Sequence, residues 1–247
     1  MIVSKKKRRT EQVAQQIKNW IEEHHLKPGD RLPNEIDVMQ AFGASKSTVR
    51  ESMRLLDAQG LLVTKTGPKG GVFVSEVSEE KATMLVSNYF FFKEMTIADI
   101  YQIRCVLEPE LAASLAGKLS QAQLNQLRDQ ISLYLSPPLT LEEEKIHHIA
   151  SIEFHRILAS FSDNQLLMFI IRFTTQLLSE LTINRRLYEP KNFDLWRKGV
   201  DHQLDLLHAL ASGDEQRARL TMRTHMEHAR MIMRLHEVDM QKRFIEA

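Results

Sequence analysis

Cysteine is nearly absent from this chain of 247 residues, which contains only Cys105. An intramolecular disulfide is therefore excluded, and a reducing, cytoplasmic location is expected. Long apolar runs are also missing, because the most apolar stretch, MLVSNYFFF, is short and is interrupted by Ser87 and Asn88. The basic start MIVSKKKRRT has no long apolar segment after it, so it does not have the pattern of a secretory signal. These absences leave a soluble globular protein, for which 43% hydrophobic and 26% charged residues are ordinary values.

The two parts of the chain carry opposite charge, although the net charge of the whole is only +1. Residues 1–75 hold 13 Lys/Arg and 8 Asp/Glu, a net charge of +5, whereas residues 76–247 hold 20 and 24, a net charge of −4. A basic front on an acidic body suggests that the front binds a polyanion. A solvated basic tail at KKKRR would give the same charge, so charge alone leaves both interpretations open.

The pattern of the front predicts the order helix, helix, turn, helix, hairpin. Apolar residues at helical spacing predict a helix over 10–25 and a second, short one over 35–42. Gly43 ends the second helix, Ser45 caps a third, and Gly60 follows its last turn. LLVTK and GVFVS then predict two short strands around the turn TGPKGG. This order defines a winged helix-turn-helix.

The rest of the chain contains no convincing strand and predicts a connecting segment followed by a bundle of six to seven helices. The fold class is therefore mostly α, with an N-terminal winged helix-turn-helix that includes a small hairpin. We call residues 1–76 the head, 77–95 the linker and connecting helix, and 96–247 the body. The helices are expected over roughly 79–92, 96–117, 120–135, 139–161, 164–187, 191–212 and 214–240.

The third helix carries small hydroxyl residues and cations on the face expected to be exposed. Hydroxyl and backbone N–H groups hold phosphates there, and an arginine can read a guanine edge with two hydrogen bonds. An amphipathic surface helix with cations is the plainer alternative, but the ordered combination with a Gly turn and a basic hairpin favours DNA binding. The candidate DNA contacts are Ser45, Lys46, Ser47, Thr48, Arg50 and Arg54, with Lys65 and Lys69 of the hairpin.

The stretch LKPGDRLPNEIDVMQAFGASKSTVRESMRLLDAQGLLVTKTGPKGGVFV resembles the DNA-binding domain of GntR-family bacterial transcription regulators. The resemblance implies that Lys46, Thr48 and Arg50 lie at DNA-contacting positions and that the hairpin tip with Gly70 enters the minor groove. The family often has arginine where this chain has Ile36 and Lys46. Ile36 makes no charged contact and Lys46 makes a point-charge contact instead of a bidentate one. We therefore expect an operator that differs from the common half-site or depends more on Arg50.

Three histidines, His155, His202 and His225, fall on three separate expected helices, from which neutral imidazoles can converge on one metal. A single histidine is more often a surface or core residue. The phrases IRCVLEPELAASLA, IEFHRILASFSDNQLL and DHQLDLLHALASGDEQRARLTMRTHM resemble the FCD-type ligand-binding domain of the FadR subfamily. The resemblance implies that these histidines hold a divalent metal of zinc, nickel or manganese type, and that residues 96–247 bind a ligand and dimerise.

Ser151 occupies the position where that subfamily has an aspartate ligand. Serine is a weak neutral ligand, so we expect a weaker site, or one completed by water and effector oxygens. His148, seven residues before His155, and His228, three residues after His225, are candidate substitutes. An empty site is the alternative.

Arginines are the candidate anchors for an effector. The resemblance implies that Arg104, in its R-x-x-L-E phrase, faces the ligand cavity, where a guanidinium pairs with a carboxylate. A structural salt bridge to Glu108, four residues on, is an equal alternative. Arg172 and Arg186 are possible second anchors.

These observations predict a transcription regulator, a repressor, in which a small carboxylate or sugar acid near a divalent metal controls affinity for DNA. A homodimer is expected, because two heads related by a two-fold axis read a palindromic operator. A metal-dependent hydrolase is the enzyme alternative, since three histidines could activate water, but no placed general base supports it and no enzyme is predicted. Two further functions compatible with the sequence are an acyl-CoA-responsive regulator without metal and a ligand-free architectural protein.

Overall fold

The computed structural model describes residues 2–68, 70–93, 95–181 and 193–235. Contacts divide the chain into two compact units that meet in sequence between Leu85 and Val86, and each is described by itself. This division falls inside a helix, within residues 77–95. The expected fold class, a winged helix-turn-helix followed by an all-helical bundle, is confirmed. Among the described residues, no helix is long and apolar enough to cross a membrane.

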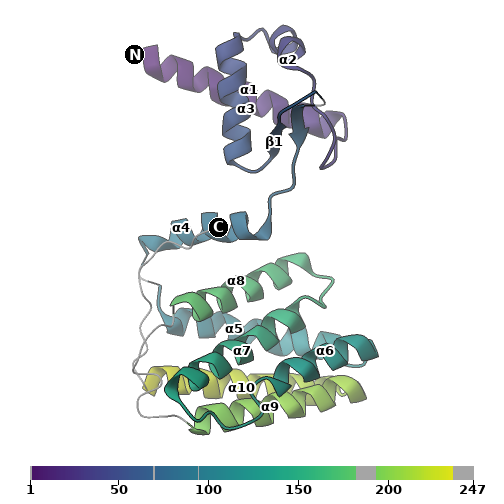
Figure 1. Cartoon of the computed structure of the whole chain (residues 1–247), viewed down its shortest axis with the longest axis vertical. Helices are drawn as coiled ribbons and strands as arrows, with labels where there is room; N and C mark the ends of the chain where they lie inside the picture. Colours follow the sequence, from purple (N-terminus) through teal and green to yellow (C-terminus); the bar gives the residue numbers. More distant parts are fainter. Residues whose placement is uncertain (1, 69, 94, 182–192, 236–247) are drawn as a thin grey trace. The chain divides into compact units, whose positions relative to one another are not determined.

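The described part of the head contains three helices and one hairpin (Figure 1), and local signals set the bounds of each. The side chain of Asn34 accepts hydrogen bonds from the backbone N–H groups of Ile36 and Asp37, and Gly43 adopts a left-handed conformation (φ 57°) after the second helix. The first helix begins eight residues earlier than expected, at Ile2. The elements are α1 (Ile2–Glu23), α2 (Glu35–Phe42), α3 (Lys46–Ala58), β1 (Leu62–Lys65) and β2 (Gly71–Val74).

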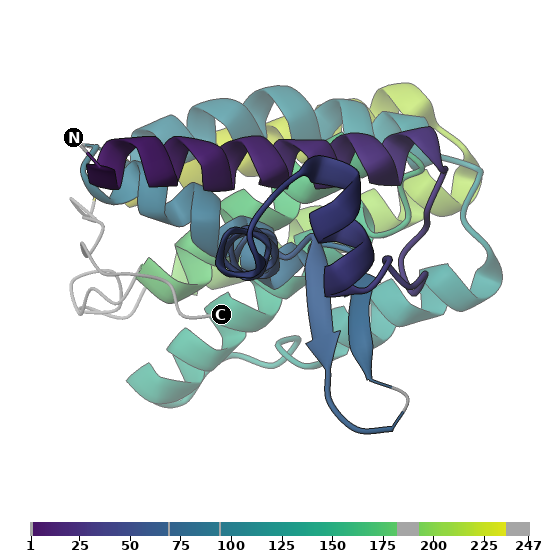
Figure 2. The ribbon, with the colours of Figure 1, turned by 90° about the horizontal axis from the view of Figure 1, so that it is seen from above.

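The strands pair antiparallel, with Leu62 opposite Val74 and Lys65 opposite Gly71, and lie side by side in Figure 2. Three apolar residues of one face of α3, Val49, Met53 and Leu56, are buried against residues of α1 and β1. Because this face packs in the core, the opposite face of α3 is exposed to solvent.

In the described part of the chain seven helices follow the hairpin, at the upper end of the expected number. The capping residues Thr96 and Ser120 both form capping boxes, and Asn164 accepts a hydrogen bond from the N–H of Leu167. A third capping box, at Thr140, is one that the sequence analysis did not predict. The helices are α4 (Glu79–Phe91), α5 (Ile97–Leu115), α6 (Gln121–Ser132), α7 (Leu141–Ala159), α8 (Gln165–Leu181), α9 (Phe193–Ser212) and α10 (Glu215–Leu235).

The core of the body lies between α5, α6, α7, α9 and α10, where residues such as Leu111, Phe154 and Met222 are fully buried. Two glycines let the end of α5 approach the end of α9. A Cβ on Gly117 would lie 3.1 Å from Cα of Gly213, and the N–H of Gly117 donates to the carbonyl of Leu210 (2.9 Å). This close approach joins the ends of α5 and α9, whose N-terminal turns line the cavity described next.

Candidate nucleic-acid interface and ligand cavity

The start of α3 presents hydroxyl groups and a cation to solvent. Ser45 caps the helix by accepting a hydrogen bond from the N–H of Thr48 (3.3 Å), while Lys46 and Ser47 are exposed. Thr48, expected on the exposed face, is only 7% exposed, and its hydroxyl lies 2.9 Å from that of Ser45. Its side chain therefore stabilises the helix start, and the exposed contacts available here come from its neighbours.

Arg50 and Arg54 are exposed on α3, and the first of them is held in place. Nε of Arg50 donates to both carboxylate oxygens of Glu35 on α2, at 2.9 and 3.0 Å. The Arg50 side chain is still 54% exposed. Sequence reasoning missed this pair, because Glu35 lies on another helix, 15 residues away.

The hairpin tip requires glycine. A Cβ on Gly70 would lie 2.6 Å from the carbonyl oxygen of Lys65, and Arg31 donates from Nη2 to the carbonyl of Gly70 (2.7 Å). Lys65 is exposed, with its ammonium 4.9 Å from the centre of the Phe73 ring. Lys69, the other expected cation of the hairpin, lies outside the described residues.

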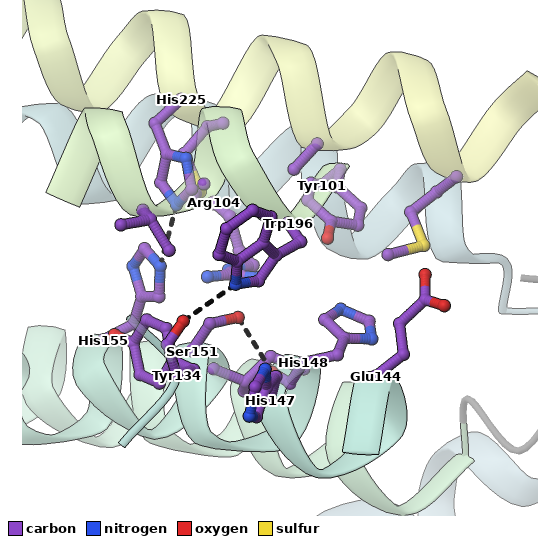
Figure 3. Close-up of a pocket in the computed structure, with 16 residues that line it drawn as sticks. Tyr101, Arg104, Tyr134, Glu144, His147, His148, Ser151, His155, Trp196 and His225 are labelled. Carbon is purple, nitrogen blue, oxygen red and sulfur yellow. Dashed lines mark hydrogen bonds between the residues drawn. The ribbon is translucent and has the colours of Figure 1, made fainter. Parts of the chain in front are cut away.

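The body contains a cavity of about 60 Å³, lined by residues of α5, α7, α9 and α10 and by Tyr134, which follows α6. Polar side chains lie at both ends: Figure 3 shows His155 and His225 at one end and Glu144 at the other. Gly199 on α9 also lines the cavity, and a Cβ added there would meet no atom within 4 Å. The other lining residues are Tyr101, Arg104, Tyr134, His147, His148, Ser151, Ile152, Trp196, Val200, Met226, Ala229 and Met233.

Arg104 is buried in the wall of this cavity, with 2% of its surface exposed. Its Nε donates to Glu108, one turn further along α5, and its guanidinium stacks at 5.3 Å from the centre of the Tyr101 ring. Its Nη2 group is buried and has no hydrogen-bond partner among the described residues. The salt bridge that the sequence offered as an alternative is thus present, and it still leaves one side of the guanidinium open.

Glu108 joins Arg104 to the histidines. Its second carboxylate oxygen lies 2.5 Å from Nδ1 of His155, and burial, which raises the pKa of Glu108, is outweighed by Arg104 and His155, so that this pKa falls to about 2. An ionised carboxylate only accepts, so Nδ1 of His155 is the protonated nitrogen. Nε2 of His155 is then left as the acceptor or ligand atom, 3.2 Å from Nε2 of His225.

Two of the three expected metal ligands are therefore adjacent, and the third lies close by. The rings of His155 and His225 are nearly parallel, and the His202 ring centre is 5.5 Å from that of His225. Within the described part of the chain, Nδ1 of His202 and Nδ1 of His225 are buried without a hydrogen-bond partner. Burial lowers the pKa of all three histidines, which favours the neutral form that binds metals. Among the described residues, no three His, Cys, Asp or Glu side chains are already gathered closely enough to hold an ion.

Ser151 and Gln203 occupy the space beside His155. The Ser151 hydroxyl donates to the carbonyl of His148 (2.8 Å). Gln203, which is fully buried, accepts from the Tyr134 hydroxyl (2.8 Å) and donates to the carbonyl of Ser151 (3.1 Å). Its amide nitrogen also lies 3.4 Å from Nε2 of His155. No sequence signal pointed to Gln203, because a lone glutamine on a helix has no motif.

The remaining candidates divide between inside and outside the cavity. His148 lines it, and burial together with Arg104 lowers its pKa to about 4. His228 lies with its ring centre 6.0 Å from that of His202. Arg172, on α8, is not among the described residues that line the cavity. Arg186 lies outside the described residues.

A winged head with an exposed cationic helix, followed by a helical body around a cavity that contains histidines and a buried arginine, defines a DNA-binding regulator with a ligand-binding domain. Comparison with known protein families shows which family of such regulators the chain belongs to. Residues 9–74 match the description "Bacterial regulatory proteins, gntR family", and residues 99–228 match the FCD domain. The chain belongs to the GntR family of transcription regulators and carries an FCD domain.

Curated relatives and solved structures agree with this assignment. The HTH-type transcriptional regulator LutR of Bacillus subtilis is 27% identical over 83% of this chain and 92% of its own length. The HTH-type transcriptional repressor NanR of Salmonella schwarzengrund is 23% identical over 90% of this chain and 82% of its own. The structure of a Streptococcus agalactiae GntR protein has a TM-score of 0.57 at 22% identity, and covers 90% of this chain and 99% of that one. This structural likeness shows the fold.

Proposed function

We propose that this regulator is a repressor whose affinity for a palindromic operator is controlled by a small carboxylate bound in the cavity of the body. The observation that carries the proposal is the Nη2 group of Arg104, buried in the cavity wall without a hydrogen-bond partner among the described residues. A buried unsatisfied donor is costly, and on a cation more so. A carboxylate accepts hydrogen bonds from a guanidinium with matching geometry, so it is the ligand class that removes this cost.

The size of the cavity supports a small acid over a long acyl chain. One water needs about 10–15 Å³ of cavity space, so a cavity of about 60 Å³ holds about four to six waters. A hydroxy or keto acid of a few carbon atoms has a comparable size. A long acyl chain exceeds this volume and would require the helices to move apart.

A divalent metal is part of the proposal, held by His155, His202 and His225. Two imidazole nitrogens that share a tetrahedral ion at about 2.0–2.1 Å lie about 3.3 Å apart, and Nε2 of His155 and Nε2 of His225 are 3.2 Å apart. The fit is incomplete, because Ser151 brings no charge and His202 has to turn toward the pair. A bound ion would act as a Lewis acid toward the carboxylate oxygens of the effector. Glu108 fixes the tautomer and orientation of His155 in either case.

For the head, we propose that Arg50 reads a guanine in the major groove and that Lys46, Arg54 and Lys65 contact phosphates. Their exposure on one helix face and on the hairpin supports this assignment. A homodimer would place two heads on the two halves of a palindrome. The family consists of transcription regulators, which supports the absence of a catalytic role. An effector acts only if it binds the DNA-bound and free states with different affinity.

The test is a thermal melt of the full chain with a panel of small hydroxy, keto and sugar acids, with and without chelator. A ligand that binds only the folded state raises the midpoint by mass action. One acid is expected to raise it, and the same acid should weaken operator binding in a titration. A rise that chelator removes would support the metal, and a rise that survives would place the recognition on Arg104 alone. No rise with any small acid, but a rise with acyl-CoA, would refute the proposed effector class.

A further inference from the structure

Ile36 is an apolar side chain left in solvent at the start of α2. It is 64% exposed, the largest exposed fraction among the large apolar side chains of the described part of the head. Val38, two residues on, is 4% exposed. Two residues span about 200° around an α-helix, so Ile36 points away from the core of the head. The first turn that carries it is held in place, because the N–H of Ile36 donates to the Asn34 side chain (2.9 Å).

The first turn of α2 lies beside the tip of Arg50. Glu35, the residue before Ile36, receives both hydrogen bonds from Nε of Arg50. Among the described residues, the two Nη groups of Arg50 have no hydrogen-bond partner, and 54% of the side chain is exposed. The carboxylate thus occupies the Nε side of the guanidinium and leaves the two Nη groups for a base. Ile36 follows Glu35 directly in the first turn of α2, the turn that holds Arg50.

An exposed branched aliphatic group beside a base-reading arginine has one matching feature in the major groove. Guanine presents O6 and N7 to an arginine, and thymine presents a C5 methyl group that apolar side chains contact. Phosphates and the polar edges of the other bases have nothing to offer a side chain without a donor or acceptor. Removal of this apolar surface from water on binding is favourable.

We propose that Ile36 reads the C5 methyl group of a thymine next to the guanine that Arg50 reads, and that Glu35 sets the spacing between the two contacts. This inference rests on the proposed operator binding by the head. It makes Ile36 a specificity-determining residue and commits each half-site of the operator to a guanine beside a thymine.

The test uses the full-length chain and an operator selected from random duplex DNA. Each thymine of the half-site is replaced in turn by deoxyuridine, which removes only the C5 methyl group, and the dissociation constant is measured by fluorescence anisotropy. Burial of a methyl group corresponds to about a fourfold change in affinity. At one thymine position of the half-site, we expect the dissociation constant to rise about fourfold for each half-site that carries deoxyuridine. At the other thymine positions we expect no change.

The variant Ile36→Ala tests whether the methyl group is recognised by Ile36 or whether its loss weakens DNA binding for another reason. It should bind the thymine operator about as weakly as the wild type binds the deoxyuridine operator, and it should not distinguish the two. Ile36→Val, which keeps a branched side chain, should retain part of the discrimination. Equal discrimination by Ile36→Ala and wild type, or none by the wild type, would overturn the assignment. Failure of the wild type to select any specific sequence would instead overturn the proposed function, and this assignment with it.

Discussion

Removal of the charge on Glu108 is expected to destabilise the body strongly. Glu108 is 1% exposed and pairs with Arg104, which is 2% exposed, so Glu108→Gln leaves a buried cation without its counter-charge. Breaking a buried pair in this way typically costs about 3–5 kcal/mol. The pKa of Glu108 gives a similar magnitude, since a fall from 4.5 to about 2, at about 1.4 kcal/mol per pKa unit, corresponds to about 3 kcal/mol.

This free energy converts to a measurable shift of the unfolding midpoint. For a domain of about 150–250 residues, 1 kcal/mol shifts the midpoint by about 2–4 °C, so Glu108→Gln should melt about 6–12 °C lower. The chain has two compact units, so the assay has to follow one of them. Trp196 lies in the wall of the cavity and Trp20 in the head. In a Trp20→Phe background, tryptophan fluorescence reports on the body alone.

The matched control is Glu110→Gln, two residues further along α5. Glu110 makes the same kind of ion pair, with Arg219 at 2.9 Å, but at the surface. Exposed pairs contribute little because water and salt screen them, so the midpoint should stay close to that of the wild type. Equal midpoints for the two variants would refute the view that Glu108 is the buried counter-charge of Arg104.

The stability that Glu108 contributes is expected to change with pH in a defined direction. The pKa of Glu108 in the folded protein lies below its value of 4.5 in the unfolded chain, so its contribution is fully present above about pH 4.5 and is lost as the pH falls toward 2. The difference in stability between wild type and Glu108→Gln should therefore be constant at neutral pH and should shrink below about pH 4.5. A difference that grows on acidification would contradict the assigned pKa direction.

Three further predictions concern the ligands. Gly199→Ala should stabilise the free protein by up to about 1 kcal/mol through helix propensity, and so raise its melting midpoint. It should also abolish the thermal response to the acid that fills the cavity; an unchanged response would show that the acid binds elsewhere. Arg50→Ala should abolish specific operator binding in a gel-shift titration while the fold is kept, and unchanged affinity would remove Arg50 from the interface. His202→Ala should lower bound metal by elemental analysis, whereas His208→Ala, exposed on the same helix, should not; equal metal content in the two variants would exclude His202 as a ligand.

Local signals are sufficient to predict most element bounds. The capping residues Ser45, Thr96 and Ser120 each accept a hydrogen bond from an N–H of the first turn of their helix, and the predicted break after Gly213 is also present. These features involve residues within four positions of each other, so their energetics can be inferred from sequence. The missed cap at Thr140, whose capping box is completed by Glu143, was readable by the same rule.

The sequence by itself determined the head, the helical body and the helix face that carries Arg50, because each depends on helix periodicity. It offered the bridge from Arg104 to Glu108, one turn apart, as one of two equal alternatives. Only the tertiary structure decided which further side chains complete the DNA-binding face and the ligand cavity. Glu35 reaches Arg50 from another helix, and the second oxygen of Glu108 reaches His155, 47 residues away. Such contacts depend on how helices cross, which is set by the packing of whole apolar faces and leaves no local pattern at the residues that meet.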